Sequence, residues 1–249
     1  MNDVALIAGA GLLAGAMNAI AGGGSFVTLP ALIAAGVPAL NANASSTVAL
    51  VPSALASAYA YRHDFRGFEG VDFRLLTLIS VVGGACGALL LLVTPQSVFA
   101  ALVPFLLLFG TLAFAFGREL GARLRERVHI TPPMMLAAQF ALGIYGGYFG
   151  GAVGIMMMAA WSLLTSAPIS VMQPARNLLN AAMNATATLL FVAGGLVFWR
   201  QTFILFGGAI VGGYFGAVYG RKIPAGPARL VISCLNAAMT ALIFWRTYF

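Results

Sequence analysis

Long stretches without any charged residue restrict this chain to a fold inside a lipid bilayer. No Asp, Glu, Lys or Arg occurs in residues 4–61, 75–117, 133–175, 177–199 or 201–220. Hydrophobic residues make up 61% of the 249 positions and charged residues 8%, whereas about 25% of residues are charged in a typical soluble domain. Because about 20 apolar residues cross the hydrocarbon core, the sequence predicts an all-α polytopic membrane protein.

A glycine pattern occurs twice, about 130 residues apart, which indicates a duplicated chain. Val-Gly-Gly-Ala-Cys-Gly-Ala at 82–88 returns as Val-Gly-Gly-Tyr-Phe-Gly-Ala at 211–217, and Pro95 returns as Pro224. We therefore expect two homologous repeats of four hydrophobic segments each: 1–117 and 133–249, joined by a polar linker at 118–132. The eight segments are expected at 4–35, 42–61, 73–93, 97–117, 133–165, 174–197, 202–220 and 228–247.

The first and fifth segments are too long for one straight crossing. Each has about 32 residues, or about 48 Å as a continuous helix, against a hydrocarbon core of about 30 Å. Glycines interrupt both, at 22–24 and at 146–154. The sequence therefore predicts that these two segments are broken, either as re-entrant hairpins or as kinked spans.

The basic residues favour the hairpin alternative. If both long segments cross once, the Arg and Lys residues divide nine to four between the two sides; if both fold back, Arg200 and Arg246 lie alone opposite the other eleven. The second division agrees better with the positive-inside rule. It also gives each half an odd number of crossings, so we expect the two repeats to be inverted.

Several classes of protein are disfavoured. The net charge of +7 comes from arginines in short connections and reports topology, so no nucleic-acid partner is expected. Cys86 and Cys234 do not occupy matching positions, and neither a disulfide nor a metal site is predicted. No cluster of acids, bases or metal ligands lies within the apolar runs, so we expect no enzyme and no cofactor.

The glycine breaks mark the expected binding site, because irregular backbone persists inside a bilayer only where it is buried in protein or lines a wet cavity. Polar residues follow each break: the run 41–47 after Pro38, and Gln173 to Asn177, then Asn180 and Asn184, after Pro168. If these runs begin helices, their free N–H groups suit an anion. Arg176, the only formal charge between Arg127 and Arg200, would compensate its charge.

The predicted substrate-binding residues combine hydrogen-bond donors with glycines that let a ligand approach the backbone. They are Asn18, Gly22, Gly23, Gly24, Ser25, Asn43, Ser46, Thr47, Gly150, Gly151, Gly154, Arg176, Asn177 and Asn180. Asn and Ser are also ordinary helix caps, and an arginine at this depth also extends to the membrane interface. The duplicated glycines of 83–87 and 212–216 are interpreted as helix-packing faces.

The stretch 15–30, Gly-Ala-Met-Asn-Ala-Ile-Ala-Gly-Gly-Gly-Ser-Phe-Val-Thr-Leu-Pro, followed by Ala-Ser-Ser-Thr at 44–47, resembles the sulfite exporter TauE/SafE family. A degenerate second copy spans 143–158. The resemblance implies a multi-pass plasma-membrane transporter that exports sulfite, a sulfonate or a related sulfur compound. Two departures, Ala152-Val153 before Gly154 and Arg176-Asn177 in the second half, suggest that half of the site is particular to this chain.

The expected function is therefore export of a small anion by alternating access at the interface of the two repeats. The expected partners are that anion and the lipid bilayer; a second copy of the chain, forming a homodimer, is a further candidate. The alternative is a membrane scaffold or partner subunit that does not transport, in which the glycines would serve close packing alone.

Overall fold

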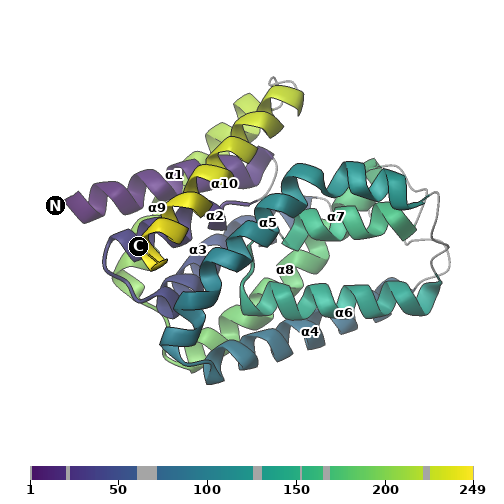
Figure 1. Cartoon of the computed structure of the whole chain (residues 1–249), viewed down its shortest axis with the longest axis horizontal. Helices are drawn as coiled ribbons and strands as arrows, with labels where there is room; N and C mark the ends of the chain where they lie inside the picture. Colours follow the sequence, from purple (N-terminus) through teal and green to yellow (C-terminus); the bar gives the residue numbers. More distant parts are fainter. Residues whose placement is uncertain are drawn as a thin grey trace.

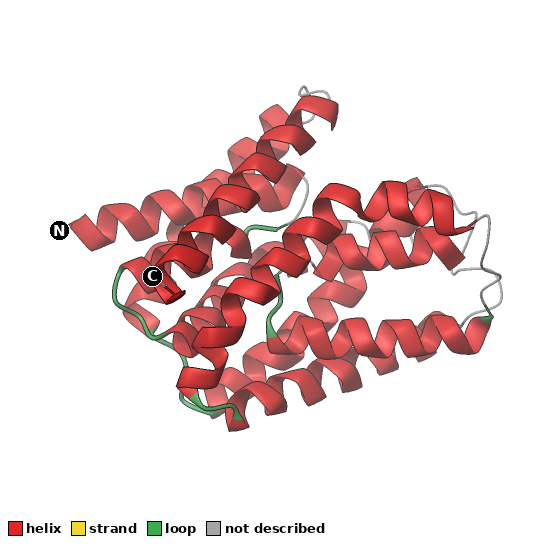
Figure 2. Ribbon diagram, viewed as in Figure 1, coloured by secondary structure: helices red, strands yellow, loops and turns green. Residues whose placement is uncertain are grey.

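The chain forms an all-helical bundle (Figures 1 and 2). The computed structural model describes residues 2–20, 23–60, 72–125, 131–151, 153–164, 169–220 and 225–248. Ten helices lie within them: α1 (Asn2–Ile20), α2 (Ser25–Ala34), α3 (Ala39–Ala60), α4 (Phe73–Val93), α5 (Gln96–Arg125), α6 (Pro132–Tyr148), α7 (Val153–Leu164), α8 (Ile169–Ala193), α9 (Trp199–Gly220) and α10 (Ala225–Tyr248).

The fifth hydrophobic segment folds back on itself as the hairpin α6–α7. The Cβ position of Gly146, at the end of α6, lies 3.1 Å from the Val153 side chain at the start of α7. Farther from the tip, the Trp161 indole N–H donates to the Gln139 side chain at 3.1 Å. Residues pair in antiparallel order, and Figure 1 shows the two helices running in opposite directions. The predicted break is confirmed, in the hairpin form.

The first hydrophobic segment is also broken, between α1 and α2. The Cβ position of Gly24 lies 2.7 Å from the carbonyl oxygen of Ala14, whereas residues ten apart in one helix would be about 15 Å apart. The chain therefore reverses here too, and Gly23 takes the left-handed φ of 97° that such a turn requires. In Figure 1 the two hairpins enter the bundle from opposite ends.

Some helix boundaries differ from the predicted segments. α5 continues eight residues past Gly117, to Arg125, so the first part of the expected linker is helical. α3 begins at Ala39 and α8 at Ile169, so both begin earlier than expected. Pro174 lies inside α8, in its second turn, so it does not mark the start of that helix as the sequence suggested.

Glycines bring two pairs of helices into backbone contact. A Cβ on Gly83 of α4 would lie 2.8 Å from the Phe140 carbonyl oxygen of α6. A Cβ on Gly216 of α9 would lie 2.7 Å from Cα of Ala16 in α1. Residue numbers rise together along both pairs, so α4 runs parallel to α6 and α1 runs parallel to α9. The predicted packing role of these glycines is confirmed.

The outer surface of the bundle is apolar. Phe105 and Phe109 of α5, and Leu230 and Trp245 of α10, are more than half exposed. Among the described helices, three are long and apolar enough to cross a bilayer by length and composition: Phe73–Val93, Gln96–Gly117 and Leu230–Tyr248. A large exposed apolar surface on such helices is what lipid contact requires.

We expect Gly212→Ala to destabilise the fold by about 1–3 kcal/mol, since the new methyl group would collide with the Leu12 carbonyl oxygen across the α1–α9 interface. The measurement is the thermal unfolding midpoint of the purified protein in detergent, which should fall.

Gly207→Ala is the matched control in the same helix, because a Cβ there meets nothing within 4 Å. It should keep or raise the midpoint, since alanine is favoured over glycine within a helix by about 1 kcal/mol. Equal losses in the two variants would contradict close packing as the cause.

Candidate functional site

Helices α3 and α8 pack against each other and place polar side chains along their contact. Asn180 and Asn184 lie one turn apart on α8, and the Asn184 side-chain nitrogen donates to the Asn180 oxygen at 3.1 Å. Asn43, Ser46 and Thr47 of α3 are 2%, 2% and 7% exposed. We call this contact, together with the tips of the two hairpins, the polar seam.

At the first hairpin the predicted residues satisfy one another. The Asn18 side-chain oxygen accepts from the Gly24 N–H at 2.9 Å. The hydroxyl of Thr28 on α2 forms a hydrogen bond with that of Ser46 on α3. The first bond holds the tip of the hairpin together and the second ties the hairpin to α3, so Asn18, Gly24 and Ser46 are engaged with other residues of the chain. Gly22 lies outside the described residues, and Ser25 is the first residue of α2.

At the second hairpin, α3 reaches the tip directly. The Asn43 side-chain nitrogen donates to the Tyr148 carbonyl oxygen at 3.0 Å. Gly150 follows with a left-handed φ of 75°, and its Cβ position lies 3.5 Å from the Thr47 hydroxyl oxygen and 3.7 Å from the Asn184 side-chain oxygen. Predicted residues from both halves, Asn43, Thr47 and Gly150, are therefore brought together, with Asn184 added.

Arg176 lies on α8, next to the start of α7. Its side-chain carbons come within 3.4 Å of the Cβ position of Gly154, in the first turn of α7. Two of its N–H groups donate to the Asn177 side-chain oxygen, at 3.1 and 2.7 Å. These distances correspond to ordinary van der Waals contact, so the Arg176 side chain packs directly against the first turn of α7.

The expectation that both polar runs supply free helix N–H groups is wrong for most of their residues, although Asn41 is the third residue of α3. Only the first four N–H groups of a helix lack an intrahelical partner, whereas Arg176 and Asn177 lie in the third turn of α8 and Asn43 in the second turn of α3. Their side chains are the relevant donors. The helix start nearest to Arg176 is that of α7.

Several polar residues of the interior were not predicted. Gln139 donates to Ser80 at 2.8 Å and accepts from Trp161, so α4, α6 and α7 share one buried network. The Thr188 hydroxyl, one turn beyond Asn184 on α8, is buried without a partner among the described residues. The regular four-residue spacing of Asn180, Asn184 and Thr188 was the sequence signal for this face.

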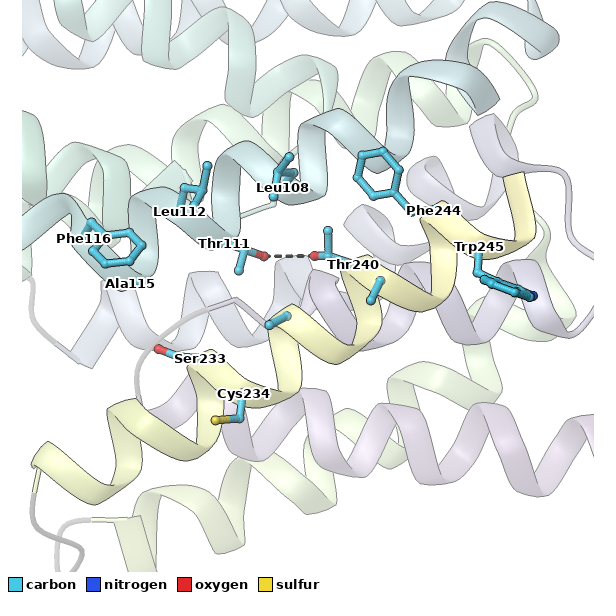
Figure 3. Close-up of a pocket in the computed structure, with 12 residues that line it drawn as sticks. Leu108, Thr111, Leu112, Ala115, Phe116, Ser233, Cys234, Thr240, Phe244 and Trp245 are labelled. Carbon is cyan, nitrogen blue, oxygen red and sulfur yellow. Dashed lines mark hydrogen bonds between the residues drawn. The ribbon is translucent and has the colours of Figure 1, made fainter. Parts of the chain in front are cut away.

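A lipid-facing groove of about 640 Å³ lies between α5 and α10 (Figure 3). Leu108, Leu112 and Phe116 line it on α5, and Cys234 and Phe244 on α10. The groove is apolar and includes none of the predicted binding residues, so we separate it from the polar seam. At its floor the hydroxyls of Thr111 and Thr240 form a hydrogen bond of 3.0 Å.

No group of three His, Cys, Asp or Glu that could hold a metal occurs in the part of the chain that the structure describes. Cys86 and Cys234 are free and exposed. The polar groups of the seam are amides, hydroxyls and one guanidinium, which can bind and release a solute.

A multi-pass helical bundle with a polar seam at two broken helices has the features of a membrane transporter. The family model of the sulfite exporter TauE/SafE matches residues 7–243, so the chain belongs to this family of membrane transporters.

Curated relatives agree with this assignment. "Probable membrane transporter protein YfcA" of Escherichia coli K12 is 31% identical over 242 residues, covering 95% of this chain and 88% of the relative. A "Probable membrane transporter protein" of Haemophilus influenzae is 31% identical over 209 residues, covering 83% and 81%. "Probable membrane transporter protein ORF9" of a Sinorhizobium species is 29% identical over 220 residues, covering 86% and 83%. No solved structure matches significantly.

Asn236 of α10 is fully buried, and both polar atoms of its amide lack a partner among the described residues. An unpaired buried polar group costs about 1–3 kcal/mol. We expect Asn236→Leu to raise the thermal midpoint in detergent, because leucine of similar size removes that cost.

Asn41→Leu serves as the control, because the Asn41 side chain donates to the Leu196 carbonyl oxygen at 2.9 Å and its loss should lower the midpoint. A lower midpoint for Asn236→Leu as well would mean that Asn236 is paired in the folded protein.

Proposed function

We propose that this chain exports a small sulfur-containing anion, such as sulfite or a sulfonate, across the bacterial plasma membrane. The substrate binds in the polar seam, and two inverted repeats expose the seam to each side in turn. The family's description as a sulfite exporter supports the substrate class, and the transporter names of the relatives weigh against the scaffold alternative.

The pairing of the helices supports two repeats related by an axis in the membrane plane. Thr111 and Thr240 are 129 residues apart and hydrogen-bonded to each other. Gly83 and Gly212 have the same separation, and each lies on a helix that packs parallel to the first helix of the other half. Equivalent residues meet only on a two-fold axis, so we place that axis at the crossing of α5 and α10.

The repeats in this proposal are 1–117 and 133–249, joined by 118–132. Arg200, at the start of α9, lies at the end of the bundle where α1 begins, because α1 and α9 run parallel. The C-terminal Arg246 lies at that end too, where both termini are drawn (Figure 1). By the positive-inside rule this end faces outward, which places the termini outside the cell.

The single observation that supports an anion as the substrate is the position of Arg176 beside the first turn of α7. A helix start carries a partial positive charge, and a guanidinium adds a full charge in a planar fork suited to oxyanions. Asn177 already holds two of the Arg176 N–H groups in a fixed direction. An inside-negative potential favours anion exit by about 2.3 kcal/mol per charge per 100 mV.

We expect Arg176→Ala to reduce flux of sulfite and sulfoacetate about 10- to 100-fold in reconstituted vesicles, since a hydrogen bond to a charged group contributes about 1.5–3 kcal/mol. Arg176→Lys should restore part of the flux, because it keeps the charge without the fork.

Arg200→Ala is the control, because Arg200 is exposed at the start of α9 and lies at the end of the bundle opposite α7. Its flux should equal that of the parent. Undiminished flux in Arg176→Ala would remove Arg176 from the binding site.

A further inference from the structure

The carbonyl end of α6 gathers oxygen atoms around the tip of the second hairpin. The three heavy atoms nearest to the Cβ position of Gly150 are all oxygens: the Gly146 carbonyl at 3.5 Å, the Thr47 hydroxyl at 3.5 Å and the Asn184 amide oxygen at 3.7 Å. Gly150 has a left-handed φ of 75°, so this position carries no side chain for a conformational reason. Oxygens from α3, α6 and α8 therefore face one point.

Each of these oxygens has lone pairs available. In a continuing helix the Gly150 N–H would donate to Gly146; here it donates to the Tyr145 carbonyl at 3.4 Å, as the Phe149 N–H does at 2.9 Å. The Asn184 amide nitrogen is engaged with Asn180, which turns its oxygen toward Gly150. Thr47 is 7% exposed, and none of the described residues forms a hydrogen bond with its hydroxyl.

Three converging acceptors at the carbonyl end of a helix suit a cation. The end of α6 carries a partial negative charge, and unwound carbonyls at broken helices are the usual sodium ligands of transporters with this design. The described ligands include no carboxylate, whereas Ca²⁺ and Mg²⁺ sites depend on carboxylates. Neutral oxygens alone favour a monovalent ion.

We propose that Gly146, Thr47 and Asn184 bind Na⁺ through these three oxygens, and that the ion strengthens anion binding on the Arg176 side of the same break. The proposal that the ion is coupled to the anion rests on the function proposed above; the ion site itself does not. In this proposal the cation binds at the end of α6 and the anion binds at the start of α7, on the two sides of the break.

The test uses the purified full-length chain in detergent without any sulfur anion. Its thermal midpoint is measured against increasing NaCl, with choline chloride holding the ionic strength constant and KCl as a second series. A ligand that binds only the folded state stabilises it in proportion to the logarithm of its concentration above Kd. We therefore expect the midpoint to rise with Na⁺ and to stay flat in choline.

Thr47→Val and Asn184→Leu should each abolish the Na⁺-dependent rise, because each removes one oxygen at nearly constant volume. Thr186→Val is the matched control: Thr186 lies two residues from Asn184 on α8, and its hydroxyl donates to its own helix at the Ala182 carbonyl, at 2.9 Å. This variant should keep the rise.

An equal response to Na⁺, K⁺ and choline, or a rise that survives in both Thr47→Val and Asn184→Leu, would overturn the site. Vesicle flux then separates the two proposals. Sulfite flux without any Na⁺ response would leave the proposed function in place and remove the ion. The opposite result is a protein that moves no sulfur anion but still responds to Na⁺, with the response retained in Arg176→Ala. That result would keep the ion site and remove the proposed substrate.

Discussion

The need to satisfy every backbone polar group inside a bilayer governs this structure. A helix end in mid-membrane leaves carbonyl or N–H groups without partners, and this chain places four such ends at its two hairpin tips. Side chains take over the missing partners: Asn18 caps Gly24, and Asn43 caps Tyr148. The capping residues come mainly from α1 and α3, which explains why α3 is so polar for a buried helix. The groups that remain unpaired are the ones available to a solute.

The two tips are not equivalent, although the sequence around them is related. At the first, Asn18 and the Thr28–Ser46 pair satisfy one another. At the second, oxygens of Gly146, Thr47 and Asn184 surround the Cβ position of Gly150, and Arg176 adds a charge, whereas residues 4–61 around the first tip carry none. The two tips therefore differ in their polar groups, although both are broken at glycines.

Sequence predicted the membrane class, the helical fold and both breaks because charge-free length and glycine position are local properties. The α4 boundaries at Phe73 and Val93 were predicted for the same reason. Sequence did not predict the helix starts at Ala39 and Ile169, since α3 begins directly after Pro38 and α8 accommodates Pro174 in its second turn. It also missed the grouping of Thr47 with Asn184, because residues 137 positions apart meet only through the packing of α3 on α8.

The parallel contact of α1 with α9 has a consequence for how the protein is made. Gly11 lies against the backbone of Leu205, about 190 residues later in the chain. At ribosomal rates of about 5–20 residues per second, α1 waits roughly 10–40 seconds before its partner is synthesised. During that interval the face of α1 that carries Gly11 and Gly15 is not yet covered by α9 and faces lipid or the insertion machinery. The final packing of α1 therefore waits until α9 has been synthesised and inserted.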